Sequence, residues 1–308
     1  MVIVIASDTT TPRADPGPLA GCLEAFARQV DAPETELIVP VHDAVDGVEE
    51  LSRRYPDVRF LHVEGPKEPS STGPRVHHYR LRARGLLEAR GELLALAEDH
   101  ARPDPHWCAN LVAAHRAGRF AGVGGALENG VDRPLQWAVY FSDYAAYQNP
   151  VPEGESTRAS DNNVAYRREA LLSVRDCWAD GFHEVIVNGA LTRRGEKLVL
   201  RRDVVMVQQR EALRLGSALR ERFVWGRQYA EIRCAALRGP RRWLLLVLSP
   251  LLPLLLTARI ARLAVGRGRG AKFLAVLPLV LALETAWSLG EAAGYWRGAS
   301  LRPLSPRS

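Results

Sequence analysis

The fold of this chain is decided by residues 93–107, which read LLALAEDHARPDPHW. Residues 93–97 form an unbroken apolar run of the length expected for a buried strand. Glu98, Asp99 and His100 follow at once, and a helical pattern begins at Trp107 after two prolines. In α/β sheets, ligands bind at the carboxyl ends of strands. This stretch therefore predicts a layered α/β fold and the position of a ligand site.

The alternation of strand and helix extends to both sides of this stretch. Apolar, β-branched runs predict strands at residues 2–6, 36–41, 58–63 and 120–126. Helical spacing predicts helices at residues 19–30, 81–89 and 107–117. Pro, Ser and Gly predict surface loops at residues 66–74 and 142–158. This order argues for a mixed, mostly parallel sheet flanked by helices.

The charge of the chain is unevenly distributed. The net charge is +6, but residues 238–308 hold 11 Lys/Arg and 2 Asp/Glu, a net of +9. The rest of the chain keeps 30 basic and 33 acidic residues, a net of −3. A basic tail rich in Leu favours an anionic membrane surface as partner. Nucleic acid is not expected, because no array of base-stacking aromatic residues accompanies the arginines.

The cysteines and the N-terminus indicate a cytoplasmic setting. The four cysteines, Cys22, Cys108, Cys177 and Cys234, show no CxxC spacing, which fits reduced thiols better than a disulfide framework. The first residues, MVIVIASDTT, have no basic region, and their apolar run is too short for a signal peptide. We therefore expect the large first domain to stay in the cytoplasm.

Two apolar segments follow a long, arginine-rich helical pattern at residues 212–237. Residues 243–258 carry no charge but two prolines, and residues 273–289 carry one proline and Glu284. Both are marginal for a spanning helix, which needs about 20 apolar residues. The loop between them is basic, and a spanning hairpin would place it outside, against the positive-inside rule. We expect re-entrant or interfacial helices on the cytoplasmic side, with a buried hairpin of a soluble protein as the alternative.

Residues 93–107 resemble the metal-binding region of family-two glycosyltransferases of the GT-A fold. In that family a strand, an Asp-x-Asp-like triplet, a Pro-x-Pro and a Trp follow one another, and the triplet binds the metal that holds the sugar-nucleotide diphosphate. Glu98 and His100 fall on the outer positions of the triplet, with Asp99 between them. The resemblance implies that Glu98 and His100 bind Mn²⁺ or Mg²⁺ and that Asp99 lies at the donor. His100 stands where the family usually has Asp.

The resemblance assigns two more residues to the donor. Arg82 lies in a stretch, residues 82–92, that is similar to the family's Arg-Asn-x-Gly…Ala-x-Gly-Glu. A guanidinium suits a diphosphate because it forms paired hydrogen bonds. Asp43 follows the second predicted strand, one residue later than the family's nucleobase-binding acid. From the residues alone, Arg82 would be an ordinary exposed arginine of a helix.

A third stretch corresponds to the acceptor side of the family's site. Residues 160–168, SDNNVAYRR, resemble the segment that precedes it. The resemblance implies that Asp161, Asn162 and Asn163 bind acceptor hydroxyls. A turn followed by a strand is the alternative, because Asn is common there.

The general base is assigned through residues 180–195, DGFHEVIVNGALTRRG. They resemble the family's Phe-x-Glu-Asp…Leu-x-x-x-Gly helix, which places Glu184 at the catalytic carboxylate and His183 on the acceptor side. A base at this position takes the proton of the acceptor hydroxyl. A helix N-terminal acid stabilised by the helix dipole is the alternative for Glu184, and a structural role is the alternative for His183. Asp180 is the rival carboxylate.

The sequence thus predicts an inverting, non-processive glycosyltransferase at the cytoplasmic face of the cell membrane. It would move a sugar from a nucleotide-diphosphate sugar to a membrane-linked or glycan acceptor. We expect a GT-A domain over residues 1–210, a linking helix over 211–240 and a basic, apolar, membrane-associated helical tail over 241–308. The alternatives are a non-catalytic nucleotide-binding protein, a processive polysaccharide synthase and a zinc protein. The zinc reading rests on His77, His78, His100, His106, Cys108 and His115, whose spacing matches no tetrahedral signature.

Overall fold

A computed structural model describes residues 1–6, 16–42, 47–64, 74–237 and 240–298 of the chain. The chain forms two compact units. The first comprises Met1–Glu128 and Asn149–Gln209, and the second comprises Asn129–Gln148 and Arg210–Ser308. Residues 129–148 are thus inserted in the sequence of the first unit but fold with the C-terminal helices.

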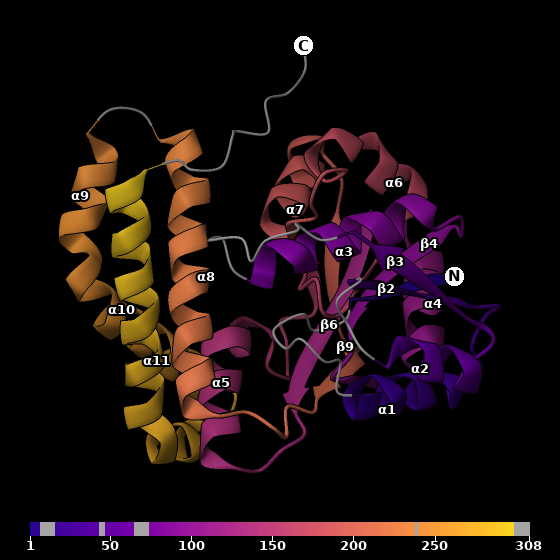
Figure 1. The fold of residues 1–308 in the computed structure, drawn as a ribbon, viewed down its shortest axis with the longest axis horizontal. Helices are drawn as coiled ribbons and strands as arrows, with labels where there is room; N and C mark the ends of the chain where they lie inside the picture. Colours follow the sequence, from indigo (N-terminus) through magenta and orange to yellow (C-terminus); the bar gives the residue numbers. More distant parts are fainter. Residues whose placement is uncertain (7–15, 43–46, 65–73, 238–239, 299–308) are drawn as a thin grey trace. The chain divides into compact units, whose positions relative to one another are not determined.

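The first unit is built on one sheet, and its described residues supply nine strands (Figure 1). The strands are β1 (Val2–Ala6), β2 (Glu36–His42), β3 (Val58–Val63), β4 (Leu93–Glu98), β5 (Ala101–Pro103), β6 (Gly122–Asn129), β7 (Gly154–Ser156), β8 (Val164–Arg167) and β9 (Leu198–Gln208). Their order is β3-β2-β1-β4-β8-β6-β9-β5, with β7 also paired to β9. Strands β1 to β4 pair in parallel, and β8 is antiparallel to both β4 and β6. Strand β9 is antiparallel to β5 and β7. The predicted mixed α/β sheet is confirmed.

The centre of the sheet explains why polar residues collect at one edge. Strand β1 and all of β4 after its first residue are buried, as the continuous apolar runs predict for parallel strands covered on both faces. Their register places Ala6 opposite Glu98. The apolar sequence therefore ends at the same level in both strands, and the residues after it lie at the carboxyl edge of the sheet.

Helices accompany the strands of the first unit. They are α1 (Pro16–Ala27), α2 (Val48–Arg54), α3 (Pro74–Glu88), α4 (Trp107–Ala117), α6 (Arg168–Ser173) and α7 (Glu184–Arg193), with a 3₁₀ turn η2 (Arg175–Cys177). Helix α3 packs closely on β1 and β2 at Gly85. A Cβ added at this glycine would come within 2.4 Å of Val4 Cγ1 and 3.0 Å of Pro40 Cγ. The missing side chain lets this helix approach the sheet and brings its polar residues toward the end of β4.

The second unit is helical. Its elements are α5 (Pro134–Tyr144), η1 (Ala145–Tyr147), α8 (Leu215–Ala236), α9 (Arg241–Leu248), η3 (Ser249–Leu251), α10 (Leu252–Gly266) and α11 (Gly270–Arg297). The loop predicted at residues 142–158 is therefore wrong in two places, where α5 ends and η1 forms and at Gly154–Ser156, which form β7. Helix α5 was missed because its apolar face is built largely of aromatic residues such as Tyr140 and Phe141, which favour strands as much as helices.

Helices α8 and α11 pack through glycines. A Cβ at Gly226 would lie 2.2 Å from the carbonyl oxygen of Trp287, and one at Gly290 would lie 2.1 Å from that of Phe223. Without these side chains the two backbones approach closely, as in small-residue helix interfaces. The Arg222–Glu284 ion pair, 2.9 Å between Nη2 and Oε1, also joins the two helices. Residues 211–240 were predicted as a helix that links two domains. In the structure, α8 belongs to the helical unit and packs on α11.

The apolar helices are longer than the sequence indicated. Residues Arg241–Gly266 form 26 nearly continuous helical residues and Gly270–Arg297 form 28, so both are long and apolar enough to cross a membrane. The prolines do not end them, because a proline is tolerated in the first turn of a helix, where Pro253 lies. Pro278 lies inside α11.

Candidate functional site

The candidate site begins where β4 ends. Glu98 is the last residue of β4, and Asp99 and His100 connect it to β5. Glu98 and Asp99 are only 8% and 7% exposed. The backbone N–H of Asp99 donates to the carbonyl of Ala6 at 3.2 Å, which fixes the turn against the end of β1.

A buried guanidinium joins this turn to the predicted acceptor segment. Arg82 Nη2 donates to Glu98 Oε1 and to Asn162 Oδ1, each at 2.8 Å. Arg82 Nη1 lies 2.6 Å from Asp161 Oδ2. Arg82 is 1% exposed. The sequence placed this arginine against the donor diphosphate, whereas in the structure it is enclosed by protein groups and links α3, β4 and the segment before β8.

Two histidines complete the surroundings of Glu98. His78 Nε2 lies 3.0 Å from Glu98 Oε1, and His100 Nε2 lies 3.3 Å from Glu98 Oε2. Burial alone would raise the pKa of the Glu98 carboxyl. The hydrogen bond from His78 and the electrostatic effect of His100, His78 and Arg82 outweigh burial and hold that pKa well below its ordinary value. Glu98 is therefore a carboxylate at neutral pH. Sequence reasoning missed this role of His78, although its spacing of four residues from Arg82 puts both on one face of α3.

The predicted metal pair is brought together. Glu98 Oε2 and His100 Nε2 are 3.3 Å apart, which is close to the separation of two ligands that each bind one cation at about 2.1 Å. The other nitrogen of the ring, Nδ1, lies 3.0 Å from Asp99 Oδ1, so Asp99 orients the imidazole. Within the described ranges, no group of three or more His, Cys, Asp or Glu side chains is arranged to hold a metal ion. The pair fits a cation that takes its remaining ligands from substrate phosphates and water, as Mg²⁺ commonly does.

The residues of the zinc reading do not converge in the part of the chain that the structure describes. His106 is exposed at the start of α4. His115 Nε2 lies 3.1 Å from the carbonyl of Ala165, and burial lowers the pKa of its ring to about 4. Burial raises the pKa of the Cys108 thiol to about 12. The side chain of His77 lies outside the described residues. An all-protein tetrahedral zinc site is therefore absent from this region of the structure.

The three residues of the predicted acceptor segment differ in their surroundings. Asp161 and Asn162 contact Arg82, as described above. Asn163 is fully buried, and its amide nitrogen donates to the carbonyls of Ala126 and Val204 at 2.7 and 3.0 Å. Its Oδ1 accepts from Trp107 Nε1 at 2.7 Å. Both amide hydrogens of Asn163 are thus used within the protein, and this side chain joins strands and helix rather than facing a ligand.

The predicted base lies at the first residue of α7. Glu184 is half-buried, whereas its rival Asp180 is exposed. The ring of His183 packs on that of Tyr79 with centroids 3.6 Å apart, and the N–H of Phe182 donates to the Tyr79 carbonyl at 3.0 Å. One turn of α3 therefore contacts both the Glu98 cluster, through His78 and Arg82, and the segment that carries Glu184.

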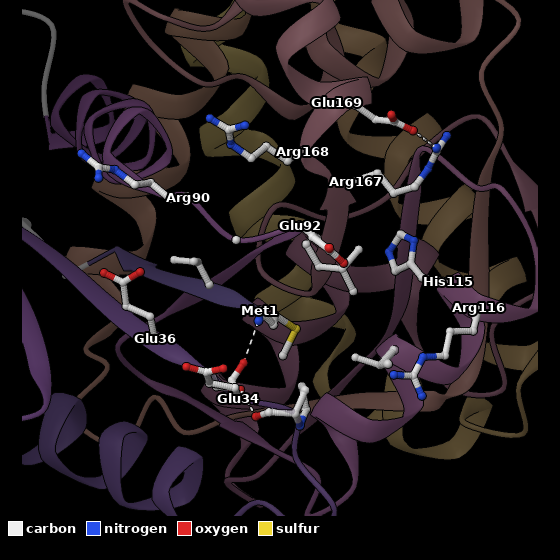
Figure 2. A pocket seen from close by; sticks show the side chains of 16 residues that line it. Met1, Glu34, Glu36, Arg90, Glu92, His115, Arg116, Arg167, Arg168 and Glu169 are labelled. Carbon is white, nitrogen blue, oxygen red and sulfur yellow. Dashed lines mark hydrogen bonds and ion pairs between the residues drawn. The ribbon is translucent and has the colours of Figure 1, made fainter.

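A cavity of the first unit lies away from the predicted site residues that the structure describes. Asp43, assigned to the nucleobase, lies outside the described residues. A cavity of about 940 Å³ lies at the opposite, amino-terminal edge of the sheet, where β1 and β4 begin (Figure 2). Its lining includes Met1, Glu34, Arg90 and Arg168. None of the predicted site residues lines this cavity, and Figure 2 labels Arg90 and Arg168 among its lining side chains.

Comparison with known proteins supports the architecture. No protein-family model and no curated protein matches the chain. Among solved structures, it is similar to the mannosyltransferase PcManGT from Pyrobaculum calidifontis in complex with GDP-Man and Mn²⁺, with 19% identity and a TM-score of 0.54 over 94% of this chain and 86% of that one. TarS from S. aureus in complex with UDP-GlcNAc gives 16% identity and a TM-score of 0.47 over 74% of this chain and 65% of that one, a score too low to equate the two folds. The chain therefore has the fold of the mannosyltransferase PcManGT.

Proposed function

We propose that this chain is an inverting, non-processive glycosyltransferase that uses a nucleotide-diphosphate sugar. The observation that carries the proposal is the cluster at the end of β4, where Glu98 and His100 face each other beside Asp99. It occupies the edge of the sheet where such folds bind ligands. The structure of PcManGT contains GDP-Man and Mn²⁺, which is the ligand chemistry that a carboxylate and an imidazole at this edge would serve.

The donor side of the reaction is assigned to the β4 turn. Glu98 and His100 would hold Mn²⁺ or Mg²⁺, and the bound cation would offset the negative charge of the leaving diphosphate. Asp99 orients the His100 ring at the donor. Arg82 would position Glu98 and Asp161 rather than bind the phosphates of the donor. Asp43 is proposed for the nucleobase.

The acceptor side is assigned to the start of α7 and the segment before β8. Glu184 would take the proton of the acceptor hydroxyl while that oxygen attacks the anomeric carbon from the face opposite the diphosphate, which inverts the configuration. The packing of His183 on Tyr79 holds this segment against α3, and the segment would then face the acceptor. Asp161 and Asn162, held by Arg82, would contact acceptor hydroxyls.

The apolar C-terminal helices favour an acceptor at a lipid surface. We infer that they attach the enzyme to the anionic cytoplasmic face of the cell membrane, where a lipid-linked or glycan acceptor would be presented. The exposed charges of residues 240–298 are basic, which suits anionic lipid.

The test is metal-dependent binding of the donor. Titration calorimetry of the full chain with a panel of nucleotide-diphosphate sugars should show binding that requires Mn²⁺ or Mg²⁺. Replacing Glu98 and His100 together by Ala should abolish the metal dependence, while His106→Ala, at an exposed histidine of the same region, should leave it unchanged. Unaltered Mn²⁺-dependent binding in the double variant would refute the metal assignment. Donor binding without transfer or hydrolysis would instead indicate a nucleotide-binding protein that lacks catalysis.

A further inference from the structure

The C-terminal helices expose a continuous apolar face. Residues 243–255 of α9 and α10 and residues 274–296 of α11 carry large apolar side chains at helical spacing, among them Val247 (74% exposed), Leu254 (65%) and Leu274 (66%). The two faces meet at one end, where the rings of Trp243 and Trp296 have centroids 5.9 Å apart. A large exposed apolar surface of this kind marks an interaction site.

The charges beside this face are of one sign. The two acids of residues 240–298, Glu284 and Glu291, are 2% and 5% exposed and contact Arg222 and Trp287. The exposed ionisable side chains of the same range are Arg241, Arg259, Arg262 and Arg297. Arg259 and Arg262 lie one and two turns beyond Leu255, so they continue the face that Leu255 belongs to. Within residues 240–298 the exposed charges are therefore all arginines, which complements an anionic lipid surface.

The packing of α8 argues against a hairpin that crosses the bilayer. Gly226 of α8 lies against the backbone of α11, and Gly290 and Gly294 of α11 lie against the backbone of α8. Helix α8 carries Arg220, Glu221, Arg222, Arg227, Glu231 and Arg233. Because the two helices are in contact over several turns, an α11 that crossed the membrane would carry these charges into the hydrocarbon, which is strongly unfavourable.

The turn of the hairpin is held by the inserted segment. Arg267 donates to the carbonyls of Ala145 and Ala146, and Arg269 donates to the hydroxyl of Tyr140 at 2.9 Å. Lys272 Nζ lies 2.7 Å from Asp132 Oδ1. Three basic residues of the predicted inter-helix loop, Arg267, Arg269 and Lys272, are thus bound to α5 and its flanks. This binding fixes the turn within the helical unit.

We propose that the apolar face of α9, α10 and α11 docks on an anionic phospholipid bilayer with the helix axes in the plane of the membrane. Arg259 and Arg262 contact phosphate headgroups, and α8 covers the side away from the lipid. This docking rests on the proposed attachment of the enzyme to the membrane. It depends on no property of the sugar-transfer site.

Vesicle binding tests the surface. The full chain should bind vesicles of phosphatidylcholine with phosphatidylglycerol more tightly than vesicles of phosphatidylcholine alone. Val247→Glu with Leu254→Glu should weaken binding tenfold or more, because two large apolar side chains are lost from the lipid contact. Val30→Glu, at an apolar residue of the first unit that is 43% exposed, should not change it. Equal binding by the double variant would overturn the proposal, as would a lipid-free dimer that the double variant disrupts and that fails to bind vesicles.

Labelling tests the orientation. In a Cys177→Ser, Cys234→Ser background, single cysteines are introduced as Arg241→Cys and as Gly266→Cys, a position where an added Cβ would meet no atom within 4 Å. The protein is added to preformed vesicles and treated with an impermeant maleimide from outside. Reaction at both positions, which lie at opposite ends of the first apolar helix, is expected for a flat arrangement. Protection of one position alone would show a spanning helix. Both experiments omit the donor, so their failure leaves the sugar-transfer proposal to be judged by donor binding.

Discussion

At the scale of single residues, Arg82 decides whether the candidate site can form. Its guanidinium lies between two buried carboxylates, Glu98 and Asp161. Replacing Arg82 by Met would leave Asp161 buried without its cation. We expect the free energy of unfolding to fall by about 3–5 kcal/mol, as for other broken buried ion pairs.

Urea unfolding of the full chain measures this effect. Arg84→Met is the matched control, because Arg84 is an exposed helix residue paired with Glu88 four positions later, and such pairs contribute about 0.3–0.5 kcal/mol. Arg82→Lys should recover only part of the stability, since the compact ammonium lacks the planar fork with which the guanidinium contacts both carboxylates. Equal stability of the Arg82→Met and Arg84→Met proteins would contradict this role.

The proposed proton transfer depends on Glu184. Glu184→Gln keeps the shape of the side chain and removes its charge. We expect donor binding to stay near the wild-type level and kcat to fall by about 10²–10⁴-fold, because a general base acts mainly in the transition state. Steady-state transfer assays and calorimetry on Glu184→Gln and Asp180→Asn provide the comparison. Full activity in the first variant with loss in the second would move the base to Asp180.

The residue scale also shows where sequence reasoning stops. The polar triplet after β4 could be placed because an apolar run and its register fix where a strand ends. The partners of Arg82 could not, because Asp161 and Asn162 are about 80 residues away in sequence. For the same reason the sequence does not separate Asn162, which contacts Arg82, from Asn163, whose amide joins β6 and β9. The roles of these neighbours are decided by tertiary contacts.

At the scale of elements, the glycine contacts between α8 and α11 set the structure of the helical unit. Gly226→Ala places a Cβ 2.2 Å from the Trp287 carbonyl, so the two helices must separate. Overpacking of this kind typically costs about 1–3 kcal/mol. We expect the thermal midpoint of the full chain, followed by circular dichroism, to fall.

Gly216→Ala is the control on the same helix. No atom lies within 4 Å of a Cβ at Gly216, and Ala favours a helix over Gly by up to about 1 kcal/mol. This variant should be neutral or slightly stabilised. A Gly226→Ala protein as stable as Gly216→Ala would mean that α8 and α11 do not pack in this way.

The buried parallel strands were predicted accurately, whereas the antiparallel strand β9 was not predicted. Strands β1, β3 and β4 lie within a residue of the predicted bounds, because buried parallel strands have uniform apolar sequences that stop at polar residues. The apolar helices were predicted too short because a charged residue was taken as an end. Arg259 and Arg262 are exposed and remain solvated, so α10 continues past them to Gly266.

At the scale of the whole molecule, the insertion at residues 129–148 has ends that meet. The backbone N–H of Asn149 donates to Glu128 Oε1 at 3.2 Å. A chain of residues 1–128 joined by a short Gly-Ser linker to residues 149–209 should therefore fold as the first unit alone. We expect a soluble monomer by size exclusion that keeps the metal-dependent donor binding of the full chain.

A chain of residues 1–209 that retains the insertion is the informative comparison. Phe141 of α5 packs on Phe273 of α11, with ring centroids 5.5 Å apart, and that partner is missing from the truncated chain. The exposed aromatic face should make this chain aggregate. A soluble 1–209 chain together with an aggregated spliced chain would show that the insertion belongs to the first unit. No turn or composition signal in the sequence marks residues 129–148 as part of another unit, because that assignment depends on contacts with helices more than 70 residues away.

The insertion also has a consequence for how the protein is made. Phe141 leaves the ribosome 132 residues before Phe273, the side chain on which it packs. At about 5–20 residues per second, roughly 7–26 s pass before that partner is synthesised. During each round of translation the aromatic face of α5 is therefore open to chaperones and to other nascent chains. The yield of assembled protein should then depend on the speed of translation between these two phenylalanines, a property that belongs to the messenger RNA as much as to the folded chain.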